Sequence, residues 1–186
     1  HGKPGGLLLW LTKSIHHSAR YVVLDSGFCV LKGLISLVKS GVFACSLIKK
    51  CRYWPAYCQG EAFDQYFVGK NVCDTAAVEG ELDGIPYKIW CFKGPDYICK
   101  MFGTAGGLNP GSDREHSRVW TEDGVSKSAT FKYAEPFTLH FKYRHAVDDH
   151  NNLRHQVPSI EETWTTIRWA CCVFSFLLAV TEVNVY

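Results

Sequence analysis

The N-terminal quarter of the chain alternates between short apolar runs and one amphipathic stretch. Residues 21–24 and 42–48 are rich in β-branched and aromatic side chains and contain no charged residue, which is typical of strands buried on both faces. Between them, apolar residues at positions 31, 34, 35 and 38 form one helical stripe. Gly41 is placed to end that helix. We therefore predict a strand–helix–strand unit over residues 21–48, with a parallel pair of strands and a right-handed crossover.

Asp25 follows the first predicted strand directly. In open α/β sheets, ligands gather at the carboxyl ends of the strands, so this carboxylate is a candidate functional residue. Ser26 and Gly27 then form a turn, and Ser26 is predicted to cap a helix over residues 28–39. The pattern leaves a second interpretation open, in which Asp25 only caps the loop between strand and helix.

The middle of the chain is β-rich and punctuated by turns. Asp83-Gly84 and Asp123-Gly124 are strong hairpin signals. The predicted strands cover residues 78–82, 87–92, 97–102, 118–120 and 128–133. A glycine-rich loop is expected over residues 103–112. We interpret residues 50–134 as a β-rich insertion between an α/β part at residues 1–49 and C-terminal helices at residues 135–186.

Two helices are predicted after the β-rich part. The first runs from about residue 137 to 155, with Pro136 in its first turn. The second begins after the capping-box pattern Ser159-Ile-Glu-Glu162. It is broadly apolar from residue 167 onward, which favours a buried core helix over a membrane span, since a span needs about 20 apolar residues.

One face of the first C-terminal helix is polar where a packed helix should be apolar. Spacings of three, four and seven residues bring the following side chains together: Arg144, Asp148, Asn151, Asn152 and His155. The adjacent Asp149 points elsewhere. The face is either a functional site or a solvated surface. The histidines recur every five residues, which does not give the spacing of three or four that a metal stripe requires.

Composition limits the classes of function. The 186 residues are 47% hydrophobic with a net charge of +2, so one domain with a core is expected and no global field forces a nucleic-acid partner. DNA binding would depend on a local cluster, Lys49, Lys50 and Arg52, with aromatic residues after it. The alternative is a solvated loop with an aromatic anchor. The nine cysteines contain no CxxC pair, which favours buried reduced thiols.

The order of these motifs resembles the middle of a piggyBac-type transposase. The resemblance covers roughly residues 20–186. It rests on a strand ending in Asp25, a basic cluster leading to Pro55, a Val-Asp148-Asp-His-Asn-Asn152 segment, and Arg168-Trp169 before an apolar run. Since the chain begins at His1 and ends inside an apolar run, we expect it to be a fragment of a longer protein.

This resemblance implies an α/β fold, namely a partial RNase H-like catalytic domain with a β-rich insertion. It implies that Asp25 and Asp148 are the second and third catalytic carboxylates and bind Mg²⁺ or Mn²⁺. The implied reaction is cut-and-paste DNA transposition. The implied partners are double-stranded DNA, as transposon ends and target, and a second copy in a homodimer, with nuclear localisation and no membrane. DNA contacts are expected from Lys49, Lys50, Arg52 and Arg168.

The chain also departs from the family pattern. The first catalytic Asp of the family lies on an earlier strand, and Asn151 occupies the fourth acidic position. With two of three core ligands, we expect the chain alone to bind metal weakly and not to cut DNA. Arg144, Asp149 and Asn151 are secondary candidates. Two functions therefore stay open: part of a transposase, or an inactive remnant, such as a domesticated DNA-binding or interaction module.

Overall fold

A computed structural model of the chain divides it into two units, His1–Lys142 and Tyr143–Tyr186, which we describe separately. The residues that it describes are 2–48, 54–55, 59–109, 115–132, 134–143, 145–146, 149, 152 and 168–185.

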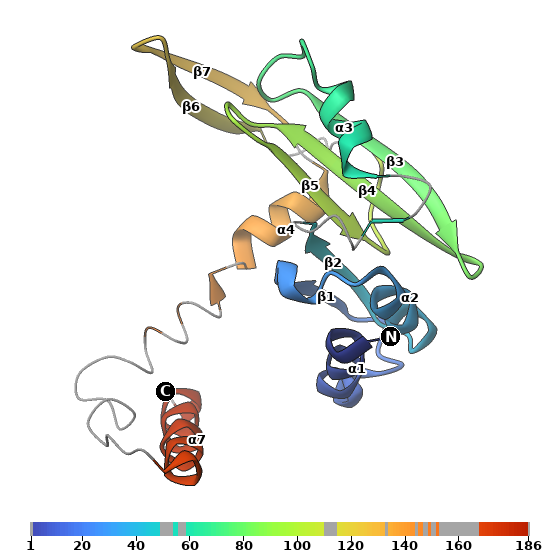
Figure 1. The fold of residues 1–186 in the computed structure, drawn as a ribbon, viewed down its shortest axis with the longest axis vertical. Coiled ribbons are helices and arrows are strands. Elements are labelled where there is room, and N and C mark those ends of the chain that lie inside the picture. Colours follow the sequence, from blue (N-terminus) through green and yellow to red (C-terminus); the bar gives the residue numbers. More distant parts are fainter. Residues whose placement is uncertain are drawn as a thin grey trace. The chain divides into compact units, whose positions relative to one another are not determined.

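A five-stranded sheet forms the centre of the first unit (Figure 1). Its strands are β1 (Tyr21–Leu24), β2 (Phe43–Leu47), β3 (Thr75–Leu82), β4 (Ile85–Lys93) and β5 (Ile98–Gly103), in the order β1-β2-β5-β4-β3. β1 and β2 are parallel, and the other neighbours are antiparallel. The predicted α/β class and the parallel pair are confirmed.

The pairing of β5 with β2 was not predicted. It joins the strands of residues 75–103 to the parallel pair in one continuous sheet. The joint is reinforced where the Ala44 N–H donates to Thr104 Oγ1 over 3.0 Å, while the Thr104 N–H donates to the Ala44 carbonyl. The division into residues 1–49, 50–134 and 135–186 stays a prediction.

The predicted helix between β1 and β2 begins at Leu31 rather than at residue 28. Helix α2 (Leu31–Lys39) follows a 3₁₀ turn, η2 (Ser26–Phe28), and its N-cap Val30 makes no side-chain cap bond. The prediction that Ser26 caps the helix is therefore wrong, because Asp25 caps η2 instead. The predicted end is confirmed at Gly41, which has φ +72°.

The end of α2 has the hydrogen bonds of a Schellman motif. The Gly41 N–H donates to the Val38 carbonyl over 2.8 Å, and the Val42 N–H donates to the Leu37 carbonyl over 2.9 Å. A Cβ on Gly41 would lie 2.9 Å from the Cα of His17. The site therefore requires glycine both for its backbone angle and for the close approach of a neighbouring turn.

Apolar side chains alternate between the two faces of the sheet. On β4, Tyr87, Ile89 and Cys91 point into a core under α1 (Gly2–Leu11), α2 and α3 (Gly60–Tyr66). Trp90 and Phe92 point to the opposite face, where Phe137 of α4 (Glu135–Tyr143) packs. Helix α3 was missed in the sequence, although the apolar pair Phe63 and Phe67 has helical spacing.

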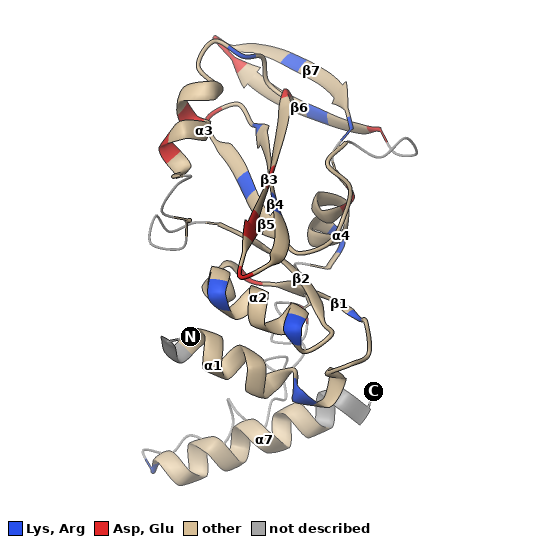
Figure 2. Ribbon diagram, turned by 90° about the vertical axis from the view of Figure 1, so that its right-hand side faces the viewer, with Lys and Arg blue, Asp and Glu red and all other residues tan. Residues whose placement is uncertain are grey.

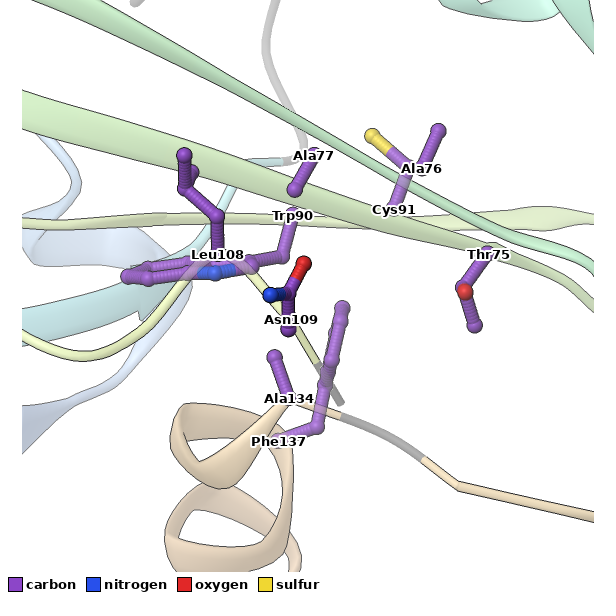
Figure 3. Close-up of a pocket in the computed structure, with 9 residues that line it drawn as sticks. All are labelled: Thr75, Ala76, Ala77, Trp90, Cys91, Leu108, Asn109, Ala134 and Phe137. Atoms are coloured by element: carbon purple, nitrogen blue, oxygen red, sulfur yellow. The ribbon is translucent and has the colours of Figure 1, made fainter. Parts of the chain in front are cut away.

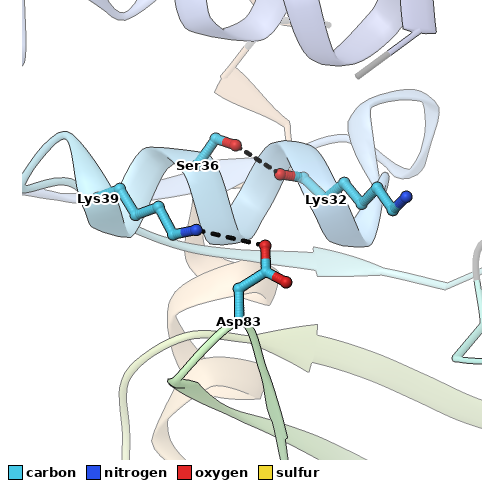
Figure 4. A network of polar contacts seen from close by, with 4 residues as sticks. All are labelled: Lys32, Ser36, Lys39 and Asp83. Carbon is cyan, nitrogen blue, oxygen red and sulfur yellow. Dashed lines mark hydrogen bonds and ion pairs between the residues drawn. The ribbon is translucent and has the colours of Figure 1, made fainter.

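The two Asp-Gly turns are confirmed. Asp83, Gly84, Asp123 and Gly124 all have positive φ, as type I′ turns require. The first turn connects β3 to β4, and the second connects β6 (His116–Glu122) to β7 (Val125–Phe131). Asp83 also contacts the Lys39 ammonium of α2 over 3.3 Å (Figure 4), but both side chains are exposed, so the pair contributes little to stability.

The second unit contains α7 (Trp169–Val185). The Asp149 N–H donates to the His145 carbonyl over 2.7 Å, which is the spacing of an α-helix. The predicted helix over residues 137–155 is thus confirmed as far as Tyr143, the end of α4, and in this bond. The capping box at residues 159–162 lies outside the described residues. Among the described residues, no helix is long and apolar enough to cross a membrane.

The seven described cysteines are free thiols, of which Cys29, Cys45, Cys73 and Cys91 are buried. Burial raises the pKa of Cys29 to about 12 and that of Cys45 to about 11. These two thiols therefore keep their protons at neutral pH, where only the thiolate would be a nucleophile or metal ligand. The expectation of inert buried thiols is confirmed for them.

Replacing Gly41 by Ala is expected to destabilise the fold by about 2–4 kcal/mol, because left-handed strain and the contact with His17 add. Gly84→Ala is the matched control, since Gly84 has φ +74° but open space around it. It should cost only about 1–2 kcal/mol. Urea unfolding of both variants measures the difference, and equal losses would show that the approach of His17 to Gly41 is not close.

Above pH 9 the stability is expected to fall as pH rises. The unfolded chain ionises its thiols near the usual pKa of 9.0, whereas folded Cys29 and Cys45 stay protonated until about pH 11–12. Each thiol therefore costs about 1.4 kcal/mol of stability per pH unit in that window. Cys29→Ala should flatten the decline between pH 9 and 11 in urea titrations, and the exposed Cys172→Ala should not.

Candidate functional site

Asp25 lies at the carboxyl end of β1, the edge strand of the parallel pair (Figure 1). Its side chain is exposed. In α/β folds, ligands bind just beyond the carboxyl ends of the parallel strands. The position predicted for this carboxylate is therefore confirmed.

Hydrogen bonds hold both the side chain and the main chain of Asp25. Its Oδ2 accepts the Gly27 N–H over 3.0 Å and so caps η2. Its carbonyl accepts the hydroxyl of the buried Ser46, over 3.0 Å, from the neighbouring strand. The capping interpretation is thus confirmed. It is compatible with metal binding, since an ionised carboxylate offers about four acceptor positions.

The chemistry of Asp25 suits a hard cation such as Mg²⁺ or Mn²⁺, which prefers carboxylate oxygens. In the part of the chain that the structure describes, no three His, Cys, Asp or Glu side chains come together as a metal cluster. A role of Asp25 as a metal ligand therefore stays a prediction. Asp148, the predicted partner of Asp25, lies outside the described residues, and the pairing of the two stays a prediction.

Several other predicted site residues also lie outside the described residues: Arg144, Asn151, Lys49, Lys50 and Arg52. Asp149 is exposed in the second unit. Arg168 is exposed just before α7, and its carbonyl accepts the N–H groups of Cys171 and Cys172 over 2.9 and 3.1 Å. Arg168 therefore occupies the N-cap position of α7.

Of the aromatic residues that directly follow the basic cluster, the structure describes Trp54. Its ring packs 5.3 Å from the ring of Phe63 on α3, centroid to centroid. The Lys100 ammonium lies 5.8 Å from the Trp54 ring. Trp54 is thus a packed anchor that positions the chain directly after the cluster, as the alternative interpretation of this segment expects.

A separate pocket of about 310 Å³ lies between β3, β4, the loop after β5 and α4 (Figure 3). The Trp90 indole forms part of its wall and donates its N–H to the Gly107 carbonyl over 2.8 Å. Its other walls include Thr75, Asn109 and Phe137. Among the described residues that line it there is no carboxylate, histidine, lysine or arginine.

Comparison with known proteins identifies the family of the chain. Neither the search of curated proteins nor that of solved structures found a similar protein. A family model described as Transposase IS4 matches residues 1–186, the whole chain. This is a DDE transposase family, which implies an RNase H-like fold, DNA binding and divalent metal ions. With its mixed α/β sheet and the carboxylate at the end of β1, the chain belongs to the Transposase IS4 family of DDE transposases.

Proposed function

We propose that the chain is part of the catalytic domain of a piggyBac-type transposase, with Asp25 and Asp148 as metal-binding carboxylates. The observation that carries the proposal is the exposed Asp25 at the carboxyl end of a parallel strand. The family match over residues 1–186 supports it, as does the order of the sequence motifs. The reaction would be DNA cleavage followed by strand transfer in the intact protein.

In this proposal the chain holds its metal ligand in place before the ion arrives. The bond from the Gly27 N–H to Asp25 Oδ2 and the bond from the Ser46 hydroxyl to the Asp25 carbonyl restrict the carboxylate. Less rotamer entropy is then lost on binding. When bound, a pair of Mg²⁺ or Mn²⁺ ions would activate the attacking water or 3′-hydroxyl and stabilise the leaving oxygen.

Because β1 is at the edge of the sheet, a further strand could pair with it and bring another carboxylate close to Asp25. The resemblance places the first catalytic Asp on an earlier strand, and the outer edge of β1 faces away from β2. A parallel strand paired along that edge would end beside Asp25. It would bring a second carboxylate to the same end of the sheet, where Asp148 is expected to complete the set.

DNA contacts are proposed for Lys49, Lys50, Arg52 and Arg168. Cations of this kind position the phosphate backbone without reading sequence. Two other exposed cations of the first unit, Lys32 and Lys39 on α2, are not among these proposed contacts (Figure 2). A nuclear location, transposon ends as partners and a homodimer complete the proposal and follow from the resemblance alone.

Replacing Asp25 by Asn is expected to weaken Mn²⁺ binding by about tenfold or more, since one of the carboxylate ligands loses its charge. The Asn side-chain oxygen can still accept the Gly27 N–H, so the free energy of unfolding should change by less than about 0.5 kcal/mol. Electron paramagnetic resonance of free Mn²⁺ measures the binding.

The matched control is Asp123→Asn, which removes an exposed carboxylate from the turn between β6 and β7 and should leave Mn²⁺ affinity unchanged. Equal affinity of wild type and Asp25→Asn would sink the metal-binding proposal. A wild-type chain that binds DNA but no Mn²⁺ would favour the inactive remnant, for which the Asn at position 151 is the sequence observation.

Replacing Lys49, Lys50 and Arg52 together by Gln is expected to weaken duplex DNA binding uniformly across sequences. Each lost phosphate contact lowers the slope of log K against log salt by about 0.9. The slope of the triple variant should therefore be smaller than that of wild type by about two to three units. Arg168→Gln should lose about one unit. Titrations of a labelled duplex at several salt concentrations measure these slopes.

The control for total charge is the triple variant of Lys32, Lys39 and Lys88 to Gln, which removes three positive charges elsewhere in the first unit. Its slope should fall less than that of the first triple variant. Equal falls would mean that the chain binds DNA through its general charge and not through the cluster after β2.

A further inference from the structure

A cleft of about 510 Å³ separates the β6–β7 hairpin from the end of β4 and the loop after α3. Its volume falls in the range of about 300–1,000 Å³ that is typical of ligand sites. The main polar and aromatic side chains that line it are Lys70, Asn71, Lys93, Asp96, Trp120, Glu122 and Lys127. It belongs wholly to the first unit.

The hairpin wall of the cleft is anchored to the sheet. The Arg118 guanidinium lies 5.6 Å from the Phe92 ring and 5.3 Å from the Tyr97 ring. Phe131 of β7 packs 5.9 Å from the same Phe92 ring. Such cation–π and aromatic contacts hold a two-stranded ribbon that would be marginal alone, so the hairpin can present a fixed surface.

Trp120 is the aromatic part of that surface and is partly exposed. Its indole N–H donates to Glu122 Oε2 over 3.2 Å, and the Lys127 ammonium contacts the same oxygen over 3.0 Å. These bonds from Lys127 and Trp120 lower the pKa of Glu122. The carboxylate therefore stays ionised and orients the indole ring beside a cation.

The opposite wall supplies two further cations. The Lys93 ammonium donates to the carbonyls of Phe67 and Lys70 over 3.1 and 2.6 Å, which uses two of its three donors. The Lys70 ammonium lies 5.2 Å from the Tyr66 ring. With Lys127, the cleft has three cations against Asp96 and Glu122, a surplus of one positive charge.

We propose that this cleft binds one unpaired nucleotide of a single-stranded DNA segment, with the base stacked on Trp120 and the phosphate near Lys70 and Lys93. An aromatic face beside cations is the arrangement that holds single strands. In a duplex the base faces are already stacked, so only an unpaired base can use the indole. The choice of DNA over other nucleotide ligands rests on the proposed function.

The test is binding of a fluorescent ten-residue oligothymidine to the full chain, followed by anisotropy. Trp120→Ala is expected to lose about tenfold or more in affinity, and Trp120→Phe, which keeps a ring, should stay within about threefold of wild type. The matched control is Trp10→Ala, since Trp10 is 71% exposed on α1, and its affinity should not change. Equal affinities of Trp120→Ala and wild type overturn the proposal.

An abasic oligomer of the same length separates stacking from charge. Wild type should bind it about tenfold more weakly than oligothymidine, and Trp120→Ala should bind the two alike. Lys70→Gln should lower the salt slope by about 0.7, the value for one contact on a single strand. Polyglutamate that competes as well as unlabelled oligothymidine would show a site for any polyanion and overturn the nucleotide assignment.

Duplex binding distinguishes the two proposals. A chain that binds duplex DNA but not oligothymidine overturns the cleft while leaving the proposed function in place. A chain that binds neither duplex DNA nor oligothymidine would overturn DNA as the partner in both proposals. Binding of both, with Trp120→Ala affecting only the single strand, supports both.

Discussion

The pairing of β2 with two different neighbours is the constraint on which the rest of the first unit depends. β2 lies between β1, to which it is parallel, and β5, to which it is antiparallel. Gly103 on β5 makes this possible, because a Cβ there would lie 2.7 Å from the Trp90 ring and 3.3 Å from the Ala44 carbonyl. With β2 fully paired, β1 remains at the edge of the sheet, and Asp25 is placed at its carboxyl end.

Local patterns in the sequence predict those parts of the fold that neighbouring residues determine. Uniform apolar runs predict β1 and β2, and each Asp-Gly pair predicts a two-residue hairpin because few other residues accept positive φ twice in succession. The predicted start of α2 is three residues too early, because the apolar stripe does not reveal that Asp25 caps a separate 3₁₀ turn before the helix. The β2–β5 pairing could not be predicted, since apolar strands of similar length carry no signal for a partner more than fifty residues away.

The same division applies to the candidate functional residues. The position of Asp25 could be predicted because the end of a strand is a local feature, and its bond from the Gly27 N–H shows its structural role as a cap. The cleft at Trp120 was missed, although the two-residue turn fixes the register that places Trp120 opposite Lys127. The opposite wall could not be predicted from the sequence, because Lys70 and Lys93 lie in separate elements that only the folded chain brings to the cleft.

The most direct test of the account is the separation of the Asp25 and Asp148 carboxylates in a crystal structure of the chain grown with Mn²⁺. The account predicts anomalous density for the ion within about 2.0–2.5 Å of an Asp25 oxygen, and the two carboxylates within about 4–8 Å of each other. Carboxylates more than about 12 Å apart, a distance that one metal site cannot span, with no ion at Asp25, would contradict it.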